Sequence, residues 1–458
     1  MSIHDEFNVL VQDSKDLLKA LEKKGAEKGV RQLLTELYPD TAHFIFELLQ
    51  NAEDSNATEV IFSLSADRLE FSHNGTALFT IDDVRSITSF GDSTKKDDLT
   101  AIGKFGVGFK AVFSYTNTPI IHSGEFHFSI ENIFIPKQIS KVYNKKTVFN
   151  IPFNNTAKPP HEAYEEIKRN IETLNESSLL FLTNIKKINY SIDGKKIGEI
   201  SKESIPNGIT KIKRDFYHTK EDSCWLVFNE ACSFHTKDNL IKKLPISIVY
   251  KVSTEEVNKG KIEIIPAGKN NEDSGTVSIY FPTTKEVSNL KFHINAPFAS
   301  TVARDSIREC AENFKLRDQL VDLYKRSIFK IKENGWLTTS FFDVLPNKDD
   351  PLKDFYKPFF ELTVELFLKD NLIPLKNGSF SNSENCYLGD NESQKIFTED
   401  DFKKLNINKA WATYPNPKNT RSSKFLSTIN VQIFRLNAFL LENYPKKGEQ
   451  IILTGLKC

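Results

Sequence analysis

The sequence has few cysteines, and their positions follow no pattern. Cys224, Cys232, Cys310, Cys386 and Cys458 are odd in number and include no C-x-x-C pair. A disulfide framework and a cysteine-rich zinc site both require paired or regularly spaced cysteines. The sequence therefore disfavours a small disulfide-stabilised scaffold and a zinc-binding module.

Net charge and long apolar runs are also missing. The 61 Lys and Arg residues balance the 61 Asp and Glu residues, so no overall positive charge attracts nucleic acid, although a local basic patch stays open. No apolar run is long enough to cross a bilayer, and the charged N-terminus is unlike a signal peptide. We expect a soluble, cytoplasmic protein without membrane contact, and we leave nucleic-acid binding open.

What the chain does contain is a change of pattern along its length. Helical periodicity at 5–37 and 41–54 gives way to alternating strands and helices, then to a strand-rich stretch and a helical run at 307–331. The predicted fold class is α+β, with a final mixed segment that is compatible with a longer chain. The predicted domains cover residues 1–190, 191–335 and 336–458.

The predicted helix TAHFIFELLQNAED, residues 41–54, carries polar side chains on one face. Glu47 and Asn51 lie four positions apart and so point in the same direction, and Asp54 follows one turn later. An amide oxygen can ligate Mg²⁺ while a nearby carboxylate activates water, a pairing that suits phosphate chemistry. Taken alone, an ordinary solvated helix face explains the same spacing more simply.

Two glycine-containing stretches and one threonine add to this pattern. SHNG, residues 72–75, follows a predicted strand, and IGKFGVGFKAVF, residues 102–113, places three glycines before a helix with a lysine in its first turn. Glycine lets a backbone approach a ligand closely, and the N–H groups at a helix start bind anions. Thr147 places a hydroxyl on a predicted strand. Each feature alone also fits an ordinary turn or strand.

Taken in order, these motifs resemble those of the GHKL ATPases, which include gyrase-type topoisomerases, heat-shock-90 chaperones, histidine kinases and MutL. FELLQNAEDSNA at 46–57 looks like the first family motif, GDSTK at 91–95 like the start of the ATP lid, and IGKFGVGFKAVF like the glycine motif of the sacsin-like branch. Segments 276–307 and 371–388 also look sacsin-like. The resemblance implies a GHKL (Bergerat) ATP-binding α/β sandwich, a β-rich α/β transducer domain and a mixed C-terminal segment.

The resemblance also implies a role for each matched residue. Glu47 corresponds to the catalytic base and Asn51 to the Mg²⁺ ligand. Arg304 is similar to an arginine that reaches the γ-phosphate from the transducer domain, and Arg308 is the alternative. The residues matched to nucleotide contacts are Asn51, Asp54, His73, Asn74, Gly75, Ser93, Thr94, Lys95, Gly103, Lys104, Phe105, Gly106, Val107, Gly108, Phe109, Lys110 and Thr147.

One position departs from the family pattern. The family usually has an aspartate two residues before the glycine of its second motif, where it accepts a hydrogen bond from the adenine amino group; here that residue is His73. A neutral imidazole nitrogen can accept one hydrogen bond, and Asn74 is an alternative acceptor. A structural histidine at a strand end is the competing interpretation.

Together these features predict a protein that binds ATP and Mg²⁺, hydrolyses ATP slowly and uses nucleotide state to control domain docking. Family analogy adds homodimerisation on ATP binding, with the helical segment 5–37 as an exchanged arm. A chaperone-like role, or a role in bacterial antiviral defence, with an unidentified client or effector extends the same hypothesis. The alternative is a regulatory module that holds nucleotide without useful hydrolysis.

Overall fold

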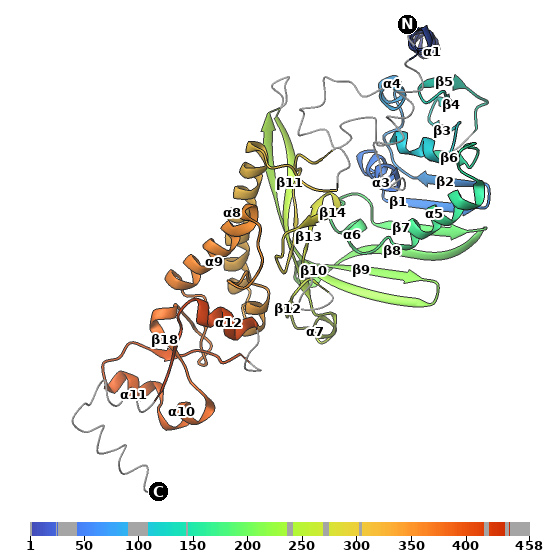
Figure 1. Cartoon of the computed structure of the whole chain (residues 1–458). Coiled ribbons are helices and arrows are strands. Elements are labelled where there is room, and N and C mark those ends of the chain that lie inside the picture. The colour runs from blue at the N-terminus through green and yellow to red at the C-terminus, as the bar shows by residue number, and fades with distance from the viewer. Residues whose placement is uncertain are drawn as a thin grey trace.

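The fold is α+β, as predicted, and one large mixed sheet dominates it (Figure 1). The sheet has 15 strands in the order β14-β13-β15-β11-β10-β9-β8-β7-β1-β2-β6-β3-β4-β5, and β12 pairs with β11 beside this path. The computed structural model describes residues 2–23, 25, 44–89, 109–142, 145–235, 241–268, 274–301, 305–415, 421–435 and 439.

The N-terminal part of the sheet packs against short helices. Its strands are β1 (Glu59–Ser65), β2 (Arg68–His73), β3 (Ile120–Ser123), β4 (Phe126–Glu131), β5 (Ile135–Gln138) and β6 (Thr147–Pro152). Its helices are α1 (Ile3–Lys23), α3 (Phe44–Asp54), α4 (Ile81–Thr88), the 3-10 turn η3 (Phe109–Ser114), α5 (Pro160–Glu172) and α6 (Ser177–Leu180).

Local sequence explains why α3 and α4 form. In α3, Phe44, Leu48 and Leu49 recur at helical spacing and are fully buried. At the start of α4, Thr80 and Asp83 form a capping box, in which each side chain accepts a hydrogen bond from the backbone N–H of the other. These two helices are the ones that position the candidate site.

Strand β1 connects the N-terminal strands to a long antiparallel ribbon. It pairs antiparallel with β2 and parallel with β7. The ribbon and the end of the sheet comprise β7 (Lys187–Ile192), β8 (Lys195–Ile205), η4 (Pro206–Gly208), β9 (Ile209–Phe216), β10 (Thr219–His235), β11 (Ile241–Val252), α7 (Thr254–Asn258), β12 (Ile264–Ile265), β13 (Thr276–Ile279), β14 (Phe281–Val287) and β15 (His293–Asn295). The sheet is continuous through residue 190, and the predicted domain boundaries stay predictions.

The C-terminal part begins with a long helix that packs along β10 and β11 (Figure 1). Its elements are α8 (Ala311–Glu333), η5 (Thr339–Asp343), η6 (Asp354–Tyr356), α9 (Lys357–Lys369), β16 (Ile373–Pro374), β17 (Phe380–Ser381), η7 (Ser383–Asn385), β18 (Cys386–Leu388), α10 (Asn391–Ile396), α11 (Glu399–Lys404), β19 (Ala410–Trp411), α12 (Arg421–Thr428) and β20 (Gln432–Ile433). The helical run expected at 307–331 corresponds to α8.

Aromatic side chains fill separate cores along the chain. Phe62, Phe71 and Phe149 belong to the N-terminal core. Phe292 and Tyr324 stack in the next core, with ring centroids 5.1 Å apart, between the sheet and α8. A small third core near the C-terminal end includes Phe402, Trp411, Phe434 and Phe439. Most phenylalanines among the described residues therefore serve as packing residues.

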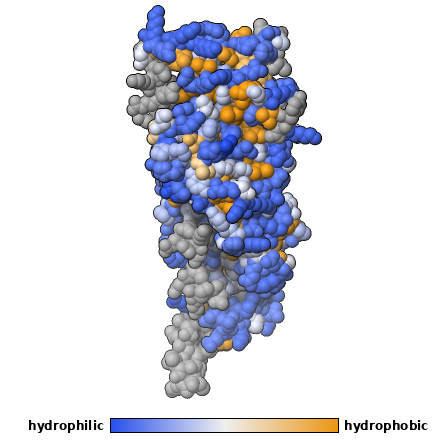
Figure 2. All heavy atoms as spheres, turned by 90° about the vertical axis from the view of Figure 1, so that its right-hand side faces the viewer, coloured by the Kyte–Doolittle hydropathy of each residue, from blue (hydrophilic) through white to orange (hydrophobic). Residues whose placement is uncertain are grey.

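The surface differs between the two ends of the molecule. Figure 2 shows apolar atoms gathered in the upper half of one face, while the lower half of that face is mainly hydrophilic. Among the residues that the structure describes, no helix combines the length and the apolar character needed to cross a bilayer.

Candidate functional site

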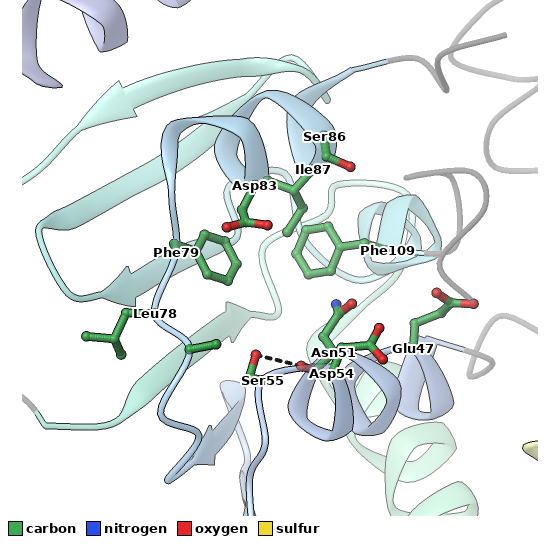
Figure 3. A pocket seen from close by; sticks show the side chains of 11 residues that line it. Glu47, Asn51, Asp54, Ser55, Leu78, Phe79, Asp83, Ser86, Ile87 and Phe109 are labelled. Atoms are coloured by element: carbon green, nitrogen blue, oxygen red, sulfur yellow. Dashed lines mark hydrogen bonds between the residues drawn. The ribbon is translucent and has the colours of Figure 1, made fainter. Parts of the chain in front are cut away.

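A cavity of about 220 Å³ lies between α3 and α4. Figure 3 shows side chains of α3 on one side of it, and side chains of α4 with the rings of Phe79 and Phe109 on the other. The described residues that line it are Glu47, Asn51, Asp54, Ser55, Ala77, Leu78, Phe79, Asp83, Ser86, Ile87 and Phe109.

The polar face predicted for α3 lines this cavity. Glu47, Asn51 and Asp54 all contribute to one wall, as their spacing on a helix requires. Glu47 is buried, with 6% of its surface exposed. Ser55 extends the wall beyond the helix, and its hydroxyl donates to the backbone carbonyl of Asn51 at 2.7 Å (Figure 3). The arrangement brings the predicted base and the predicted metal ligand to one site, while their chemical roles stay predictions.

The opposite wall is largely apolar. Phe79, Ile87 and Phe109 lie there, and both rings pack against Phe149, with centroids 6.0 Å from it for Phe79 and 5.8 Å for Phe109. Phe149 belongs to the buried core and holds the two rings from behind. An apolar slot beside a polar helix face is the arrangement expected for a ligand with a flat ring and a charged tail.

His73 is buried behind this wall and is not among the residues that line the cavity. It ends β2, is 1% exposed and packs near Phe71 and Phe149. Its Nδ1 accepts a hydrogen bond from the backbone N–H of Gly75 at 3.2 Å, so Nε2 carries the proton of the neutral ring. Nε2 has no hydrogen-bond partner among the described residues. The structure therefore gives His73 a free donor instead of the free acceptor that the sequence suggested.

Burial also fixes the charge state of His73. Desolvation of the ring lowers the pKa of His73 to about 4, because the surroundings disfavour the imidazolium ion. The side chain is consequently neutral over the physiological range, and its protonation does not occur near pH 6.5.

Asn74 and Gly75 have structural contacts in the turn after β2. The side-chain oxygen of Asn74 accepts from the backbone N–H groups of Thr58 and Glu59, at 2.9 and 3.0 Å. A Cβ on Gly75 would lie 2.7 Å from atoms of Ser55, so only glycine lets the turn approach the end of α3 this closely. Asn74 is thus engaged with the start of β1, and Gly75 lets the turn lie against Ser55 in the cavity wall.

Thr147 acts on the cavity wall through another residue. Its hydroxyl, fully buried on β6, is 2.7 Å from the hydroxyl of Ser123 on β3. Ser123 in turn accepts from the backbone N–H of Phe79 at 3.1 Å. This chain of contacts holds Phe79 in the wall, so the observed contribution of Thr147 to the site is indirect.

Lys110 is directed away from the cavity. Its ammonium group is buried and donates to the carbonyls of Ile87 on α4 and Ile133 before β5, both at 2.7 Å. Burial lowers the pKa of Lys110 to about 7. In this position the side chain ties η3 to α4, and the contact with phosphate predicted for it stays untested.

Several predicted site residues lie outside the described part of the chain. They are Ser93, Thr94, Lys95, Gly103, Lys104, Phe105, Gly106, Val107, Gly108 and Arg304. The predicted ATP lid, the phosphate-binding glycines and the arginine of the transducer domain are therefore expectations from the sequence alone.

The charge of the cavity wall limits its chemistry. Three carboxylates, those of Glu47, Asp54 and Asp83, face a space whose described lining contains no lysine, arginine or histidine. Asp83 is partly used by its capping box, where its carboxylate accepts from the N–H and hydroxyl of Thr80. An anionic ligand fits beside these groups only with a cation, and the amide of Asn51 is an oxygen donor suited to Mg²⁺. Among the described residues, no group of three or more His, Cys, Asp or Glu side chains is arranged to hold a metal alone.

Sequence reasoning missed part of the lining. Asp83, Ser86 and Ile87 lie on α4, and the direction of their side chains depends on how this helix packs. The alternation of Val84 and Ile87 with polar residues was a usable signal for the buried face of that helix. Phe79 carried no such signal, because the hydroxyl of Ser123, far away in the sequence, fixes its backbone.

Residues 70–162 match the family model described as Sacsin domain. The chain is 36% identical over 134 residues to Protein NO VEIN of Arabidopsis thaliana, covering 28% of this chain and 5% of that protein. It is 36% identical over 125 residues to human Sacsin, covering 22% of this chain and 3% of Sacsin. Among solved structures, the N-terminal domain of a DNA repair protein matches with a TM-score of 0.38 and 12% identity, over 67% of this chain and 98% of that one.

The matched region runs from β2 to the start of α5 and includes the turn at 73–75, η3 and Thr147. The N-terminal part of the chain thus contains a sacsin-like domain. The chain spans only a few per cent of the length of the two curated relatives, 5% of NO VEIN and 3% of Sacsin.

Proposed function

We propose that this chain binds ATP with Mg²⁺ in the cavity between α3 and α4, hydrolyses it slowly, and uses nucleotide state to control the docking of its β-rich part. The observation that carries the proposal is the common direction of Glu47 and Asn51, which α3 presents to one cavity opposite an apolar slot. The similarity of residues 70–162 to the Sacsin domain, together with the resemblance of the motifs to those of GHKL ATPases, supports the choice of nucleotide.

The cavity with its apolar slot is large enough for the adenine base but too small for the whole nucleotide. Its volume of about 220 Å³ is below the 300–1,000 Å³ that is typical of ligand pockets, so the phosphates extend beyond it. Phe79, Ile87 and Phe109 supply apolar contacts for a flat base. The adenine amino group needs an acceptor, and in this proposal the carboxylates of Asp54 and Asp83 provide it, because Nδ1 of His73 is already used by Gly75.

The chemistry follows from the polar wall. Bound Mg²⁺ would neutralise phosphate charge beside three carboxylates, and Asn51 would hold it through the amide oxygen. Glu47 lies one helical turn away on the same face, where it can accept the proton of the water that attacks the γ-phosphate. Burial of Glu47 keeps this carboxylate shielded from bulk solvent.

Dimerisation on ATP binding is part of the proposal. α1 packs on its own chain through the buried Phe7, whose ring lies 6.4 Å from that of Phe126 and 6.1 Å from that of Phe128, and through the partly buried Leu10, Val11, Leu18 and Leu21. On the same helix, Val9 is 49% and Leu17 43% exposed. A helix with only one fully buried apolar side chain, and with others partly or largely exposed, is suited to exchange between two copies. Analytical ultracentrifugation with and without ATP tests this, and a monomer in both conditions would exclude the exchange.

Two substitutions on α3 test the site. Glu47→Ala should leave ATP binding intact in calorimetry and lower turnover by about 10²–10⁴-fold, the usual contribution of a general base. Asn51→Ala should weaken Mg²⁺-dependent binding itself. Glu70→Ala, an exposed carboxylate on neighbouring β2, is the matched control and should change neither. Equal turnover in Glu47→Ala and the parent protein would remove the assigned base, and ATP binding without turnover in the parent would leave a nucleotide-holding module.

A further inference from the structure

A second and larger cavity lies between the connection that follows α6 and the face of strands β8 to β11. Its volume is about 530 Å³, within the range of small-molecule sites. Figure 1 shows α6 beside β7 and β8. The described residues that line the cavity are Leu180, Phe181, Leu182, Thr183, Lys186, Lys202, Glu203, Ser204, Gly208, Thr210, Val227, Asn229, Pro245 and Ser247.

Two lysines give this cavity a positive charge. Lys202 on β8 donates to the backbone carbonyls of Leu179 and Leu182, and Lys186 donates to the carbonyl of Thr183. Neither ammonium group forms an ion pair with a described carboxylate. The one lining carboxylate, Glu203, is paired with Lys213 at 2.7 Å. Because an ammonium group has three donors, each lysine retains at least one for a ligand.

The state of Lys202 agrees with an anion site. Burial, and then the nearby charge of Lys186, lower the pKa of Lys202 to about 8 against the opposing charge of Glu53, which leaves it mostly protonated at pH 7. Neutral hydrogen-bonding groups lie around the two cations. Asn229 and Ser247, on adjacent strands, have no side-chain hydrogen bond to another described residue.

The loop at 183–185, which lies beside both lysines, is held in place from outside the cavity. The carboxylate of Glu53 on α3 accepts three consecutive backbone N–H groups, those of Thr183, Asn184 and Ile185, at 2.6, 2.7 and 2.9 Å. Three bonds to one carboxylate fix a loop more firmly than a single contact does. The loop then presents its carbonyls to Lys186 and Lys202, so the positions of both cations are set before any ligand arrives.

We infer that this second cavity binds a small oxyanion with at least two acidic oxygens, such as a phosphate or a dicarboxylate, through Lys186 and Lys202. Two cations without carboxylate partners, in a space lined by hydroxyl and amide groups, match that chemistry. The site is separate from the cavity between α3 and α4, whose wall carries carboxylates.

Equilibrium dialysis of the whole chain against radiolabelled inorganic phosphate, without nucleotide, tests the inference. Saturable binding is expected, and Lys186→Gln and Lys202→Gln should each weaken it by about tenfold or more, the cost of one charged hydrogen bond. Lys186 is exposed, so its loss tests binding even where replacing the more buried Lys202 disturbs folding. Lys187→Gln is the matched control: it removes the same charge next door, from a side chain paired with Glu199 at 3.0 Å, and should bind normally.

The other outcomes overturn the inference. Absence of saturable binding by the parent protein removes the site for phosphate, and repeating the dialysis with labelled succinate tests the carboxylate form; failure of both rejects the oxyanion class. An equal loss of phosphate binding in Lys187→Gln indicates adventitious surface binding only. Loss in Asn51→Ala but not in the Lys186 variant indicates that phosphate occupies the first cavity instead.

Discussion

The two cavities of this chain carry opposite charges. The first, between α3 and α4, has carboxylates on its wall and no described basic residue, while the second has two lysines and one carboxylate that is already paired. An acidic cavity can hold a polyphosphate only with added cations, whereas a basic one can hold an oxyanion directly. The first cavity therefore needs added cations before it can hold a polyphosphate. A metal ion or another part of the chain would have to supply them.

The largest expected effect is a loss of ATP turnover when the cation that the β-rich part would supply is removed. Arg304→Ala should lower ATP turnover by about 10³-fold, because a cation at the developing phosphoryl charge is worth that much in related chemistry. ADP affinity should change little, since ADP has no γ-phosphate. Steady-state turnover and ADP calorimetry measure the two effects.

The control for that change is Arg308→Ala. The backbone N–H of Arg308 donates to the carbonyl of Ala299 at 2.9 Å, which holds this segment beside β15 whatever the side chain. If Arg308→Ala alone slows turnover, the docking residue lies one turn later in the sequence. If neither does, the first cavity obtains its cations without the β-rich part.

Removal of Mg²⁺ should give the next largest effect and should separate the two cavities. With EDTA present, ATP affinity at the first cavity should fall by about 100-fold or more, because phosphate charge would meet Glu47, Asp54 and Asp83 without neutralisation. Phosphate binding to the second cavity, measured by dialysis, should stay the same. Loss of both activities on chelation would show that the charge contrast does not govern binding.

The sequence predicted some of this arrangement for clear physical reasons. Glu47, Asn51 and Asp54 were placed together because helical spacing is a local property, and all three line one cavity. The α+β class also followed from local periodicity. Predictions of this kind need no knowledge of distant parts of the chain.

Other positions depended on contacts that no local pattern records. Lys110 bonds to carbonyls 23 residues away on either side, and the hydroxyl of Thr147 meets Ser123 on another strand. The second cavity has the same origin, because four strands and a loop contribute to its wall. His73 was located at a strand end, but its tautomer depended on the turn at Gly75.

A smaller effect concerns the pH dependence of folding stability, to which the neutral side chain of His73 behind the first cavity contributes. The pKa of His73 is depressed to about 4 by burial, against 6.5 in an unfolded chain, so below pH 6.5 the unfolded state binds the proton first. The contribution of this residue to stability is therefore complete above pH 6.5 and is lost as pH falls from 6.5 toward 4. The loss should reach on the order of 3 kcal/mol.

Urea unfolding at pH 7 and pH 4.5 measures this dependence. His73→Gln should be less stable at pH 7 but should show a smaller fall between the two values than the parent protein. His161→Gln, an exposed histidine at the start of α5, is the control and should leave the dependence unchanged. An identical fall in the parent and in His73→Gln would mean that His73 does not set the acid sensitivity.

The smallest expected effect concerns the hydrogen bonds that connect α3 to the loop of the second cavity. Glu53 lies two positions after Asn51 on α3, and it is the residue that holds the loop of the second cavity. Glu53→Gln keeps the size of the side chain but replaces one acceptor oxygen by an NH₂ group, which faces a backbone N–H and cannot accept from it. One N–H of the loop is left unpaired, at a cost of about 1 kcal/mol in unfolding free energy.

The carbonyls that position Lys202 should then be less well ordered, and phosphate affinity should fall about threefold to tenfold. The control is Glu59→Gln, a half-buried glutamate whose side chain accepts a hydrogen bond from the amide of Asn189 at 2.7 Å, a bond that survives the change because Gln retains a carbonyl oxygen. Phosphate dialysis and urea unfolding of both variants provide the comparison. If Glu53→Gln binds phosphate as the parent does, the loop is held by its own packing, and α3 serves the first cavity alone.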